Sequence, residues 1–388
     1  MRIIAALLLA FLTGCATVDH GPAPEALFTD ARFAAPSAPV SVDNLFTLNP
    51  AMRQYLHSTR FQQLLQEKGS IHGLLDALYE KGELRLEYDS SMTRTAAQTF
   101  DARAGNCLSL VIMTAAFAKE IGMVVRFQSV DVDETWSRSA SLYLVSSHVN
   151  VSLGRKPMLD LLHTGEPDEL TTVDFLPPPD AAKLRTEPLT EQDIVTLYMN
   201  NRAAESLVLG RVDDAYWWAR SAAARENAPA SVFNTLGVVY QHHGDLAQAE
   251  LVFRAALQRD PNSLVAMQNL VPLLAENGKQ AESAALAARV AKLNPHPPFQ
   301  YFDDGMRAYR KGDFVRAKEL FAREVERAPY NDEFHFWLAM ACLQLGQPQL
   351  AREQLTLAME SSTTVDNRER YAAKLVHLHK LVTGPQGD

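Results

Sequence analysis

The residue most suited to covalent chemistry is Cys107. It follows a Gly-Asn step and precedes an apolar, Ala-rich run with helical spacing. Asn106 is a good N-cap residue and Gly122 a good helix stop, so the sequence predicts a helix of about 14 residues with the thiol in its first turn. The unpaired N–H groups and the positive dipole end at that turn favour a thiolate, the nucleophilic form of cysteine. The same N–H groups can bind an oxyanion that forms beside the sulfur.

A thiolate nucleophile needs a base, and the base needs a group that orients it. His148 lies inside the strand-like segment 141–153. Two aspartates follow it, Asp160 in the short run MLDLL and Asp174 in the strand-like run 170–176. The sequence therefore places a Cys at a helix start, a His on a strand and an Asp further along the chain.

This order resembles a transglutaminase-like, papain-related domain. The resemblance rests on RAGNCLSL before a helix, a VVRF-type strand, SSHVNV and TVDF, and it covers residues 45–180. It implies an α+β fold in which the helix bearing the cysteine packs on an antiparallel sheet. It also implies that Cys107 is the nucleophile, that His148 is the general base and acid, and that an aspartate orients the imidazole.

Two members of the implied site stay open. TVDF looks more like the family's Asp-bearing strand, which favours Asp174, whereas a tight turn at 154–155 would place Asp160 opposite His148. Gln98 lies upstream of the cysteine, as the oxyanion-donating glutamine does in papain-like enzymes. The alternative for Gln98 is an exposed helix residue.

The composition limits the classes of function. The 388 residues suggest two or three domains, and a hydrophobic fraction of 47% suffices for ordinary cores. The formal net charge is −9 and no long basic run is present, so nucleic-acid binding is not expected. The sequence has three cysteines, Cys15, Cys107 and Cys342, and each has a separate expected role, that of Cys342 being a core residue. These separate roles argue against a disulfide framework.

Neither a cofactor nor a metal site is expected. His242 and His243 adjoin at a predicted helix end, but no further ligands lie at suitable spacing. Some periplasmic relatives of the transglutaminase-like fold bind calcium through clustered acids, and Asp131, Asp133 and Glu134 form such a cluster. A solvated loop is the favoured interpretation of that cluster.

The N-terminus has the pattern of a secretory signal. Residues 1–15 hold one Arg, a short apolar stretch and small residues before Cys15. Leu-Thr-Gly-Cys resembles a bacterial lipobox, which implies cleavage before Cys15 and lipidation of that cysteine. Ala16 follows rather than Asp, which by that family's sorting rule implies the outer membrane, facing the periplasm. An ordinary signal peptide that happens to contain a Cys is the alternative.

The remaining chain divides into four parts. Residues 16–42 hold four prolines with little periodicity and are expected to form a flexible tether. Residues 43–178 form the transglutaminase-like domain, and the Pro-rich stretch 179–192 is the expected linker. Helical, Ala-rich sequence fills 193–382.

A 34-residue period determines the expected fold of this last part. The glycines that mark the period are Gly210, Gly244, Gly278, Gly312 and Gly346. The period and the residues in register with it resemble tetratricopeptide repeats, which implies five helix pairs, a capping helix and an all-α solenoid. Each pair cannot bury its apolar face alone, so the pairs stack. The concave face of such an array usually binds a peptide or protein.

Two classes of function follow. The first is an envelope-anchored cysteine peptidase or amidase, or a transglutaminase-like acyl transferase, whose acyl-thioester at Cys107 is resolved by water or by an amine. Hydrolysis is favoured because bacterial relatives of the fold are often proteases. The second is a non-catalytic lipoprotein scaffold for an envelope or secretion complex. In both, the repeats recruit a protein partner or substrate, and Cys15 attaches the chain to a membrane.

Overall fold

The computed structural model covers most of the chain. It describes residues 21, 23–80, 82–139, 142–155, 170–175, 186–295, 299–329 and 331–383, without the side chains of 131–147, 365 and 379–383. Cys15 and Asp160 lie outside the described residues, and the acidic cluster at 131–134 lies outside the described side chains.

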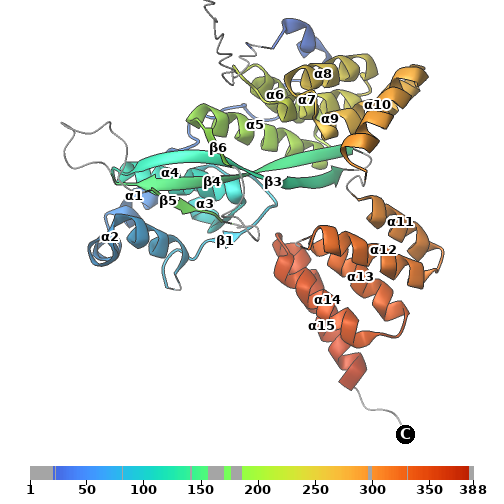
Figure 1. The fold of residues 1–388 in the computed structure, drawn as a ribbon. Helices are drawn as coiled ribbons and strands as arrows, with labels where there is room; N and C mark the ends of the chain where they lie inside the picture. Colours follow the sequence, from blue (N-terminus) through green and yellow to red (C-terminus); the bar gives the residue numbers. More distant parts are fainter. Residues whose placement is uncertain are drawn as a thin grey trace, which may run out of the picture.

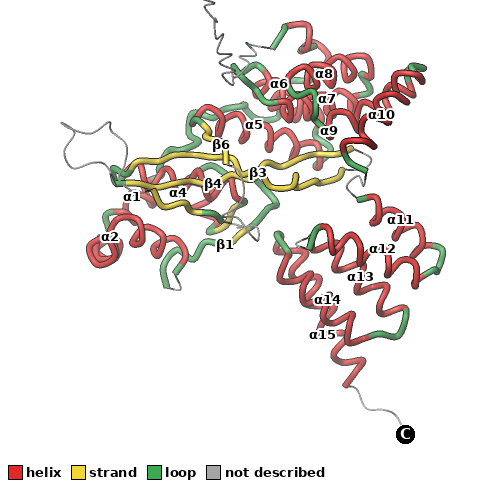
Figure 2. Tube along the Cα trace, viewed as in Figure 1, coloured by secondary structure: helices red, strands yellow, loops and turns green. Residues whose placement is uncertain are grey.

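The N-terminal domain combines helices with a mixed set of strands (Figures 1 and 2). Its helices are α1 (Pro50–Leu56), α2 (Thr59–Tyr79), α3 (Ala96–Ala102) and α4 (Cys107–Glu120). Its strands are β1 (Glu87–Tyr88), β2 (Ala104–Gly105), β3 (Val124–Ser139), β4 (Leu142–Gly154), β5 (Leu170–Val173) and β6 (Thr186–Leu189). The strands β1 and β2 pair in parallel, and the larger sheet is antiparallel with the order β5-β4-β3-β6.

Helix α4 is the central helix of this domain. All side chains from Cys107 to Ala118 are buried, which fits the apolar, Ala-rich sequence that predicted the helix. The helix packs against β3 and β4, so its N-terminus is held beside the sheet (Figure 1). Gly122, with φ at 78°, follows its C-cap residue Ile121, as the sequence predicted.

A register shift interrupts the long β3–β4 hairpin. Val130 pairs with His148, and the next pair is Thr135 with Ser146. More residues are inserted on β3 than on β4, which is a bulge, and bulges re-aim the side chains beside them. His148 is the β4 residue of the pair next to this bulge, at the end of the regular ladder that begins with the pair Val124 and Gly154.

The stretch expected to be a linker contributes to the sheet. Strand β6 pairs with β3 as the outer strand, and α5 begins at Glu191. A proline in a strand cannot donate a ladder hydrogen bond, which an edge strand tolerates. Pro188 lies in β6, opposite Gln128 of β3.

The C-terminal half is helical throughout. Its helices are α5 (Glu191–Val208), α6 (Val212–Ala223), α7 (Ala230–His243), α8 (Leu246–Arg259), α9 (Leu264–Glu276), α10 (Gln280–Leu293), α11 (Gln300–Arg310), α12 (Phe314–Arg327), α13 (Asp332–Gln344), α14 (Pro348–Ser361) and α15 (Val365–Thr383). Within the described residues, α5 to α14 form five antiparallel pairs. The period-34 glycines lie in the turn of each pair with φ between 68° and 86°, a left-handed conformation that favours glycine.

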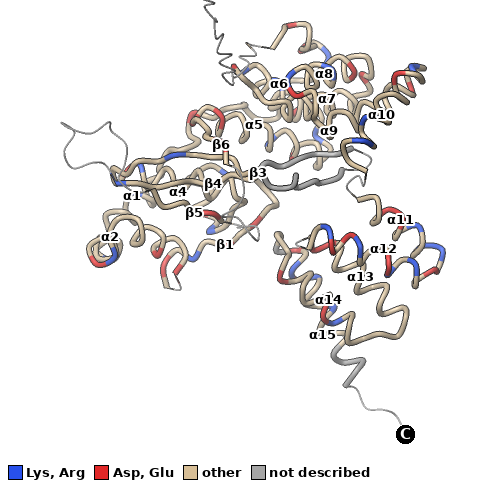
Figure 3. The backbone as a smooth tube through the Cα atoms, viewed as in Figure 1, with Lys and Arg blue, Asp and Glu red and all other residues tan. Residues whose placement is uncertain are grey.

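The helical half contains two separate cores. One apolar cluster joins the N-terminal domain to α5–α9, and a second joins α11–α15. Figure 1 shows α11–α15 as a group apart from α5–α10. Acidic and basic residues are interspersed along α11 and α12 (Figure 3). The second group meets the N-terminal domain where Ser90 donates from its backbone N–H to the Thr363 carbonyl at 2.8 Å.

The stretch expected to be a flexible tether is partly folded onto the repeats. Two short 3₁₀ helices, η1 (Glu25–Leu27) and η2 (Asp30–Arg32), lie in it. Leu27 and Phe33 are buried against α6–α8. The composition indicated a tether and could not reveal the surface that holds this segment, because the bonding residues lie 177 to 222 positions further along the chain.

Candidate functional site

Cys107 occupies the first position of α4. The Asn106 side chain caps the helix, since its Oδ1 accepts from the Ser109 backbone N–H at 2.9 Å and from the Ser109 hydroxyl at 2.7 Å. The Asn106 amide also donates to the Thr93 hydroxyl at 2.7 Å. Cys107 is 8% exposed. The thiol is thus fixed at the end of the helix where unpaired N–H groups concentrate.

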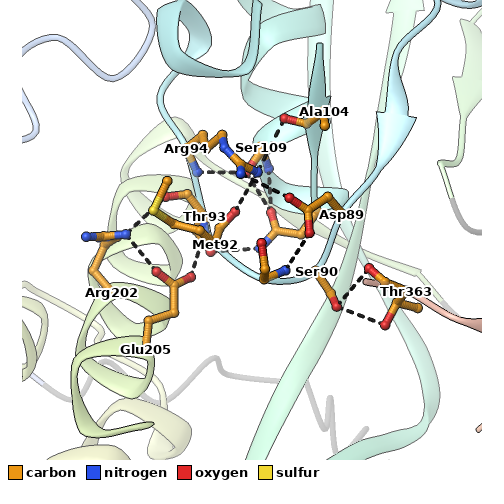
Figure 4. Close-up of polar contacts among 12 residues, drawn as sticks. Asp89, Ser90, Met92, Thr93, Arg94, Ala104, Ser109, Arg202, Glu205 and Thr363 are labelled. Atoms are coloured by element: carbon orange, nitrogen blue, oxygen red, sulfur yellow. Dashed lines mark hydrogen bonds and ion pairs between the residues drawn. The ribbon is translucent and has the colours of Figure 1, made fainter. Parts of the chain in front are cut away.

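A polar network supports the loop in front of this helix (Figure 4). Ser109 Oγ accepts from the Arg94 backbone N–H at 2.8 Å, and Arg94 forms an ion pair with Asp89 at 3.0 Å. The Thr93 N–H donates to Glu205 of α5 at 2.6 Å. Burial raises the pKa of the Glu205 carboxyl, against the lowering effect of its hydrogen bonds. The network connects the loop in front of α4 to α5, the first helix of the repeats.

His148 and Asp174 lie together on the sheet. Nε2 of His148 is 2.8 Å from Oδ1 and 2.9 Å from Oδ2 of Asp174. Their side chains are 10% and 13% exposed. The β4–β5 register pairs Val151 with Val173, which makes His148 and Asp174 diagonal neighbours on one face.

The electrostatics of His148 connect this pair to the cysteine. Burial alone lowers the pKa of His148, but the hydrogen bond to Asp174 and the influence of the nearby Cys107 side chain raise it to about 9. Because Nε2 meets the carboxylate, Nδ1 is the ring nitrogen left for the thiol. The structure therefore brings Cys107, His148 and Asp174 into one cluster.

Tyr88 is a further member that the sequence reasoning missed. It pairs with Gly105 across the β1–β2 ladder, and its side chain lies close enough to Cys107 to interact with it electrostatically. Burial is the main cause that raises the pKa of the Tyr88 hydroxyl, and the neighbouring Cys107 charge adds to it. The alternating run LRLEYD gave a strand signal, but nothing local indicated its partner.

Gln98 has a different place from the one expected for an oxyanion donor. It is exposed, and its Oε1 accepts from the Thr95 backbone N–H at 3.0 Å. The Gln98 N–H donates in return to the Thr95 hydroxyl at 3.3 Å. This is a capping box at the start of α3, and the pattern Thr-x-x-Gln is its sequence signal. Among the described interactions, none joins Gln98 to Cys107.

Other candidate groups lie away from this cluster. Cys342 is buried in α13, and burial raises the pKa of its thiol. The described residues contain no group of three or more His, Cys, Asp or Glu that could hold a metal ion. None of the described helices is long and apolar enough to cross a membrane.

Family models match two segments of the helical half. Residues 230–263 match one tetratricopeptide-repeat model, and residues 302–362 match another. These segments correspond to the second helix pair and to the fourth and fifth. The C-terminal half is a tetratricopeptide-repeat solenoid. Repeats of this family generally bind proteins or peptides.

Solved structures of repeat proteins resemble the same half. A thermophilic tetratricopeptide-repeat protein of Thermus thermophilus, TTC0263, is 19% identical with a TM-score of 0.31, covering 47% of this chain and 99% of that one. YrrB, described as having an unusual peptide-binding site, is 18% identical with a TM-score of 0.26, covering 46% and 92%. MamA from Desulfovibrio magneticus RS-1 is 18% identical with a TM-score of 0.26, covering 47% and 97%. No curated protein matches the chain.

Proposed function

We propose that this protein binds a partner through its repeats and carries a cysteine acyl-transfer site in its N-terminal domain. The observation that supports the site is the convergence of Cys107, His148 and Asp174, with 2.8 Å between the imidazole and the carboxylate. A histidine between a thiol and a carboxylate is the arrangement that activates a nucleophilic cysteine.

The chemistry follows from the positions of these groups. Cys107 Sγ attacks the carbonyl carbon of an amide, and the oxyanion that forms is stabilised by N–H groups in the first turn of α4. His148 passes its proton to the leaving amine, and the amide C–N bond breaks to leave an acyl-thioester. His148 then takes a proton from an attacking water or amine, the C–S bond breaks and Cys107 is released. Water gives a carboxylic acid, as in a peptidase or amidase, and an amine gives a new amide, as in a transferase. Asp174 orients the imidazole and stabilises its charged form.

The first test is the pH dependence of Cys107 alkylation. We would use a chain lacking residues 1–15, with Cys342→Ala to remove the second thiol. A free thiol titrates near pH 8.5. Fast alkylation at about pH 6 that slows in His148→Ala supports a thiolate–imidazolium pair. If the alkylation rate follows the pH dependence of a free thiol and does not change in His148→Ala, the proposed enzymatic function is contradicted.

The two outcomes of the acyl-thioester are separated by a second assay. A protein substrate is incubated with a fluorescent primary amine, and the products are resolved by mass spectrometry. New peptide termini indicate hydrolysis, and incorporated amine indicates transfer. Both products must disappear in Cys107→Ala.

A scaffold without catalysis is the second candidate function. It is favoured by the fact that the matched family models fall within the repeats alone. A scaffold predicts that partner capture is unchanged in Cys107→Ala, with no thioester formed. Capture that depends on Cys107, or a trapped acyl-enzyme, argues for the enzyme.

We also propose a lipid anchor at Cys15, with the chain on the outer membrane facing the periplasm. The support is the Leu-Thr-Gly-Cys sequence at residues 12–15. Several acyl chains on one residue give stable anchoring. Metabolic labelling with an alkynyl fatty acid should mark the chain and fail in Cys15→Ser. Equal labelling of both contradicts the anchor.

A further inference from the structure

The N-terminal segment lies on the repeats as a bound peptide would. Figure 1 shows this segment beside α6 and α8. Apart from η1 and η2, residues 23–41 have no regular secondary structure, and no strand or long helix joins them to the array. The contacts are made by side chains of the repeats.

Side chains of α6–α8 bond the backbone of this segment. The Tyr240 hydroxyl donates to the Leu27 carbonyl at 2.9 Å and accepts from the Thr29 N–H at 3.1 Å. The Trp217 indole donates to the Ala34 carbonyl at 2.6 Å. Gln248, Asp213 and Asp214 bond the backbones of Ala26, Ala34 and Ser37 at 2.8, 3.0 and 2.6 Å. The bond from Tyr240 to the Leu27 carbonyl is buried, and a buried backbone group without a ladder needs such a partner.

An aromatic side chain anchors the segment. The Phe33 ring stacks on Tyr216 with centroids 3.7 Å apart and an interplanar angle of 1°. Tyr240 meets the same ring edge-on at 5.7 Å, and His243 lies 4.3 Å away. Phe33 is buried in this contact. A buried aromatic in a pocket of partly polar aromatics is the usual energetic centre of a peptide interface.

Two charged pairs just before Phe33 in the chain fix its register. Arg32 forms an ion pair with Asp245, and Asp30 forms one with Arg220 at 3.2 Å. Asp30 also accepts from the Tyr216 hydroxyl at 2.6 Å. Burial acts to raise the pKa of Asp30, but the bonds to Tyr216 and Arg220 outweigh it and lower that pKa. The surface thus distinguishes an acidic position from a basic one two residues later.

We propose that α6–α8 form a peptide-docking site, filled in cis by residues 25–37, whose partner in trans is a peptide with the Asp-x-Arg-Phe pattern of residues 30–33, bound in the same 3₁₀ turn. Residues 37–39, which connect the segment to the N-terminal domain, are exposed. Tethering raises the local concentration of the cis segment to the millimolar range, so a free peptide competes poorly while the connection is intact. Release of the segment opens the site to a partner. This inference stands apart from the chemistry proposed for Cys107.

The test uses the full chain with a protease recognition sequence inserted between Ala38 and Pro39. A fluorescent peptide of residues 23–40 is titrated before and after cutting, and binding is followed by anisotropy. We expect saturable binding to the cut chain and at least tenfold weaker binding to the uncut one. A cut segment that stays bound, with no exchange for the labelled peptide, overturns the proposal and makes the segment a permanent structural strap.

Two matched controls establish the specificity. The peptide with Arg32→Glu should bind the cut chain at least tenfold more weakly, and Asp245→Arg in the chain should restore its binding. The peptide with Phe33→Ala should not bind. Equal binding of all three peptides overturns the assigned pattern. If the insertion disturbs folding, the full chain with Phe33→Ala replaces it, and that chain should capture the unaltered peptide in trans.

Discussion

The Asp174 carboxylate lies 2.8 Å from Nε2 of His148, although 26 residues separate them in the chain. The pairing of β4 with β5 makes them diagonal neighbours, so the contact follows from strand register and not from a local turn. A carboxylate at Nε2 orients the ring, stabilises its charged form and leaves Nδ1 towards Cys107.

This contact predicts which aspartate controls the cysteine. Asp174→Asn keeps the shape of the side chain but removes the carboxylate, whose hydrogen bond and charge both raise the pKa of His148. We expect the alkylation rate of Cys107 at pH 6.5 to fall about tenfold, because fewer thiols are ionised when the imidazolium is less stable. The measurement is the rate of labelling by an uncharged alkylating agent.

Asp160→Asn is the matched control for this experiment. Asp160 was the alternative orienting residue at the level of the sequence, and the same chemical change is made there. Its labelling rate should equal that of the unaltered chain. A loss of labelling in Asp160→Asn with none in Asp174→Asn would reverse the assignment.

The raised pKa of His148 predicts a decline of stability in alkaline solution. Its folded pKa of about 9 exceeds the ordinary value of 6.5. The contribution to the free energy of unfolding is therefore fully present below pH 6.5 and is lost as the pH rises through 9. We expect a decrease on the order of 1–2 kcal/mol between pH 6.5 and 9.5, allowing for partial solvent screening. Urea unfolding at several pH values measures it.

His148→Gln separates this effect from other titrations. Glutamine keeps a polar side chain but has no proton to lose in this range. The difference in unfolding free energy between the two chains should shrink towards high pH. A constant difference across the whole range would show that folding does not raise the pKa of the imidazole.

Asn106→Ala should destabilise the start of α4. The substitution removes the oxygen that accepts from the Ser109 backbone N–H, and it removes the amide that donates to the Thr93 hydroxyl. Loss of a cap costs about 1 kcal/mol, and the buried bond to Thr93 adds a similar amount, so we expect a loss of roughly 2 kcal/mol. Asn106→Asp keeps the acceptor and loses the donor, so its loss should be smaller. Equal stability of all three chains contradicts a capping role.

The sequence predicted the parts of this protein that depend on local signals. Asn106 and Gly122 correctly predicted the two ends of α4, because helix caps and left-handed turns depend on local sequence. The glycine period predicted the helix pairs for the same reason. Residues 25–37 were expected to be a tether because proline content is local, whereas the partners Tyr216 and Tyr240 are distant in sequence.

The place of Gln98 illustrates a conflict between two kinds of signal. Its position before Cys107 suggested an oxyanion donor by resemblance, but Thr-x-x-Gln is also a capping pattern. The structure has the capping box. Tyr88 reaches Cys107 through the pairing of two short strands, which no periodicity in the sequence could indicate.

The close helix packing in the second repeat gives a prediction about Gly237. An alanine in a helix interior normally stabilises by about 1 kcal/mol relative to glycine. Here a Cβ on Gly237 would lie 2.5 Å from the Phe253 ring, closer than atoms can approach. The helices α7 and α8 must therefore separate or the ring must leave its rotamer, at a cost of roughly 1–3 kcal/mol. We expect Gly237→Ala to lower the midpoint of urea unfolding.

Two further chains identify the cause of that loss. Adding Phe253→Leu removes the ring that the new methyl group meets, so the added cost of Gly237→Ala should largely vanish in that background. Gly305 faces Phe321 in the fourth repeat at 2.6 Å, so Gly305→Ala should behave in the same way in the second core. If Gly237→Ala costs as much in the Phe253→Leu chain as in the unaltered one, backbone conformation and not contact with the ring sets the requirement for glycine. If it stabilises the unaltered chain, α7 and α8 are less tightly packed than the 2.5 Å between a Cβ on Gly237 and the Phe253 ring implies.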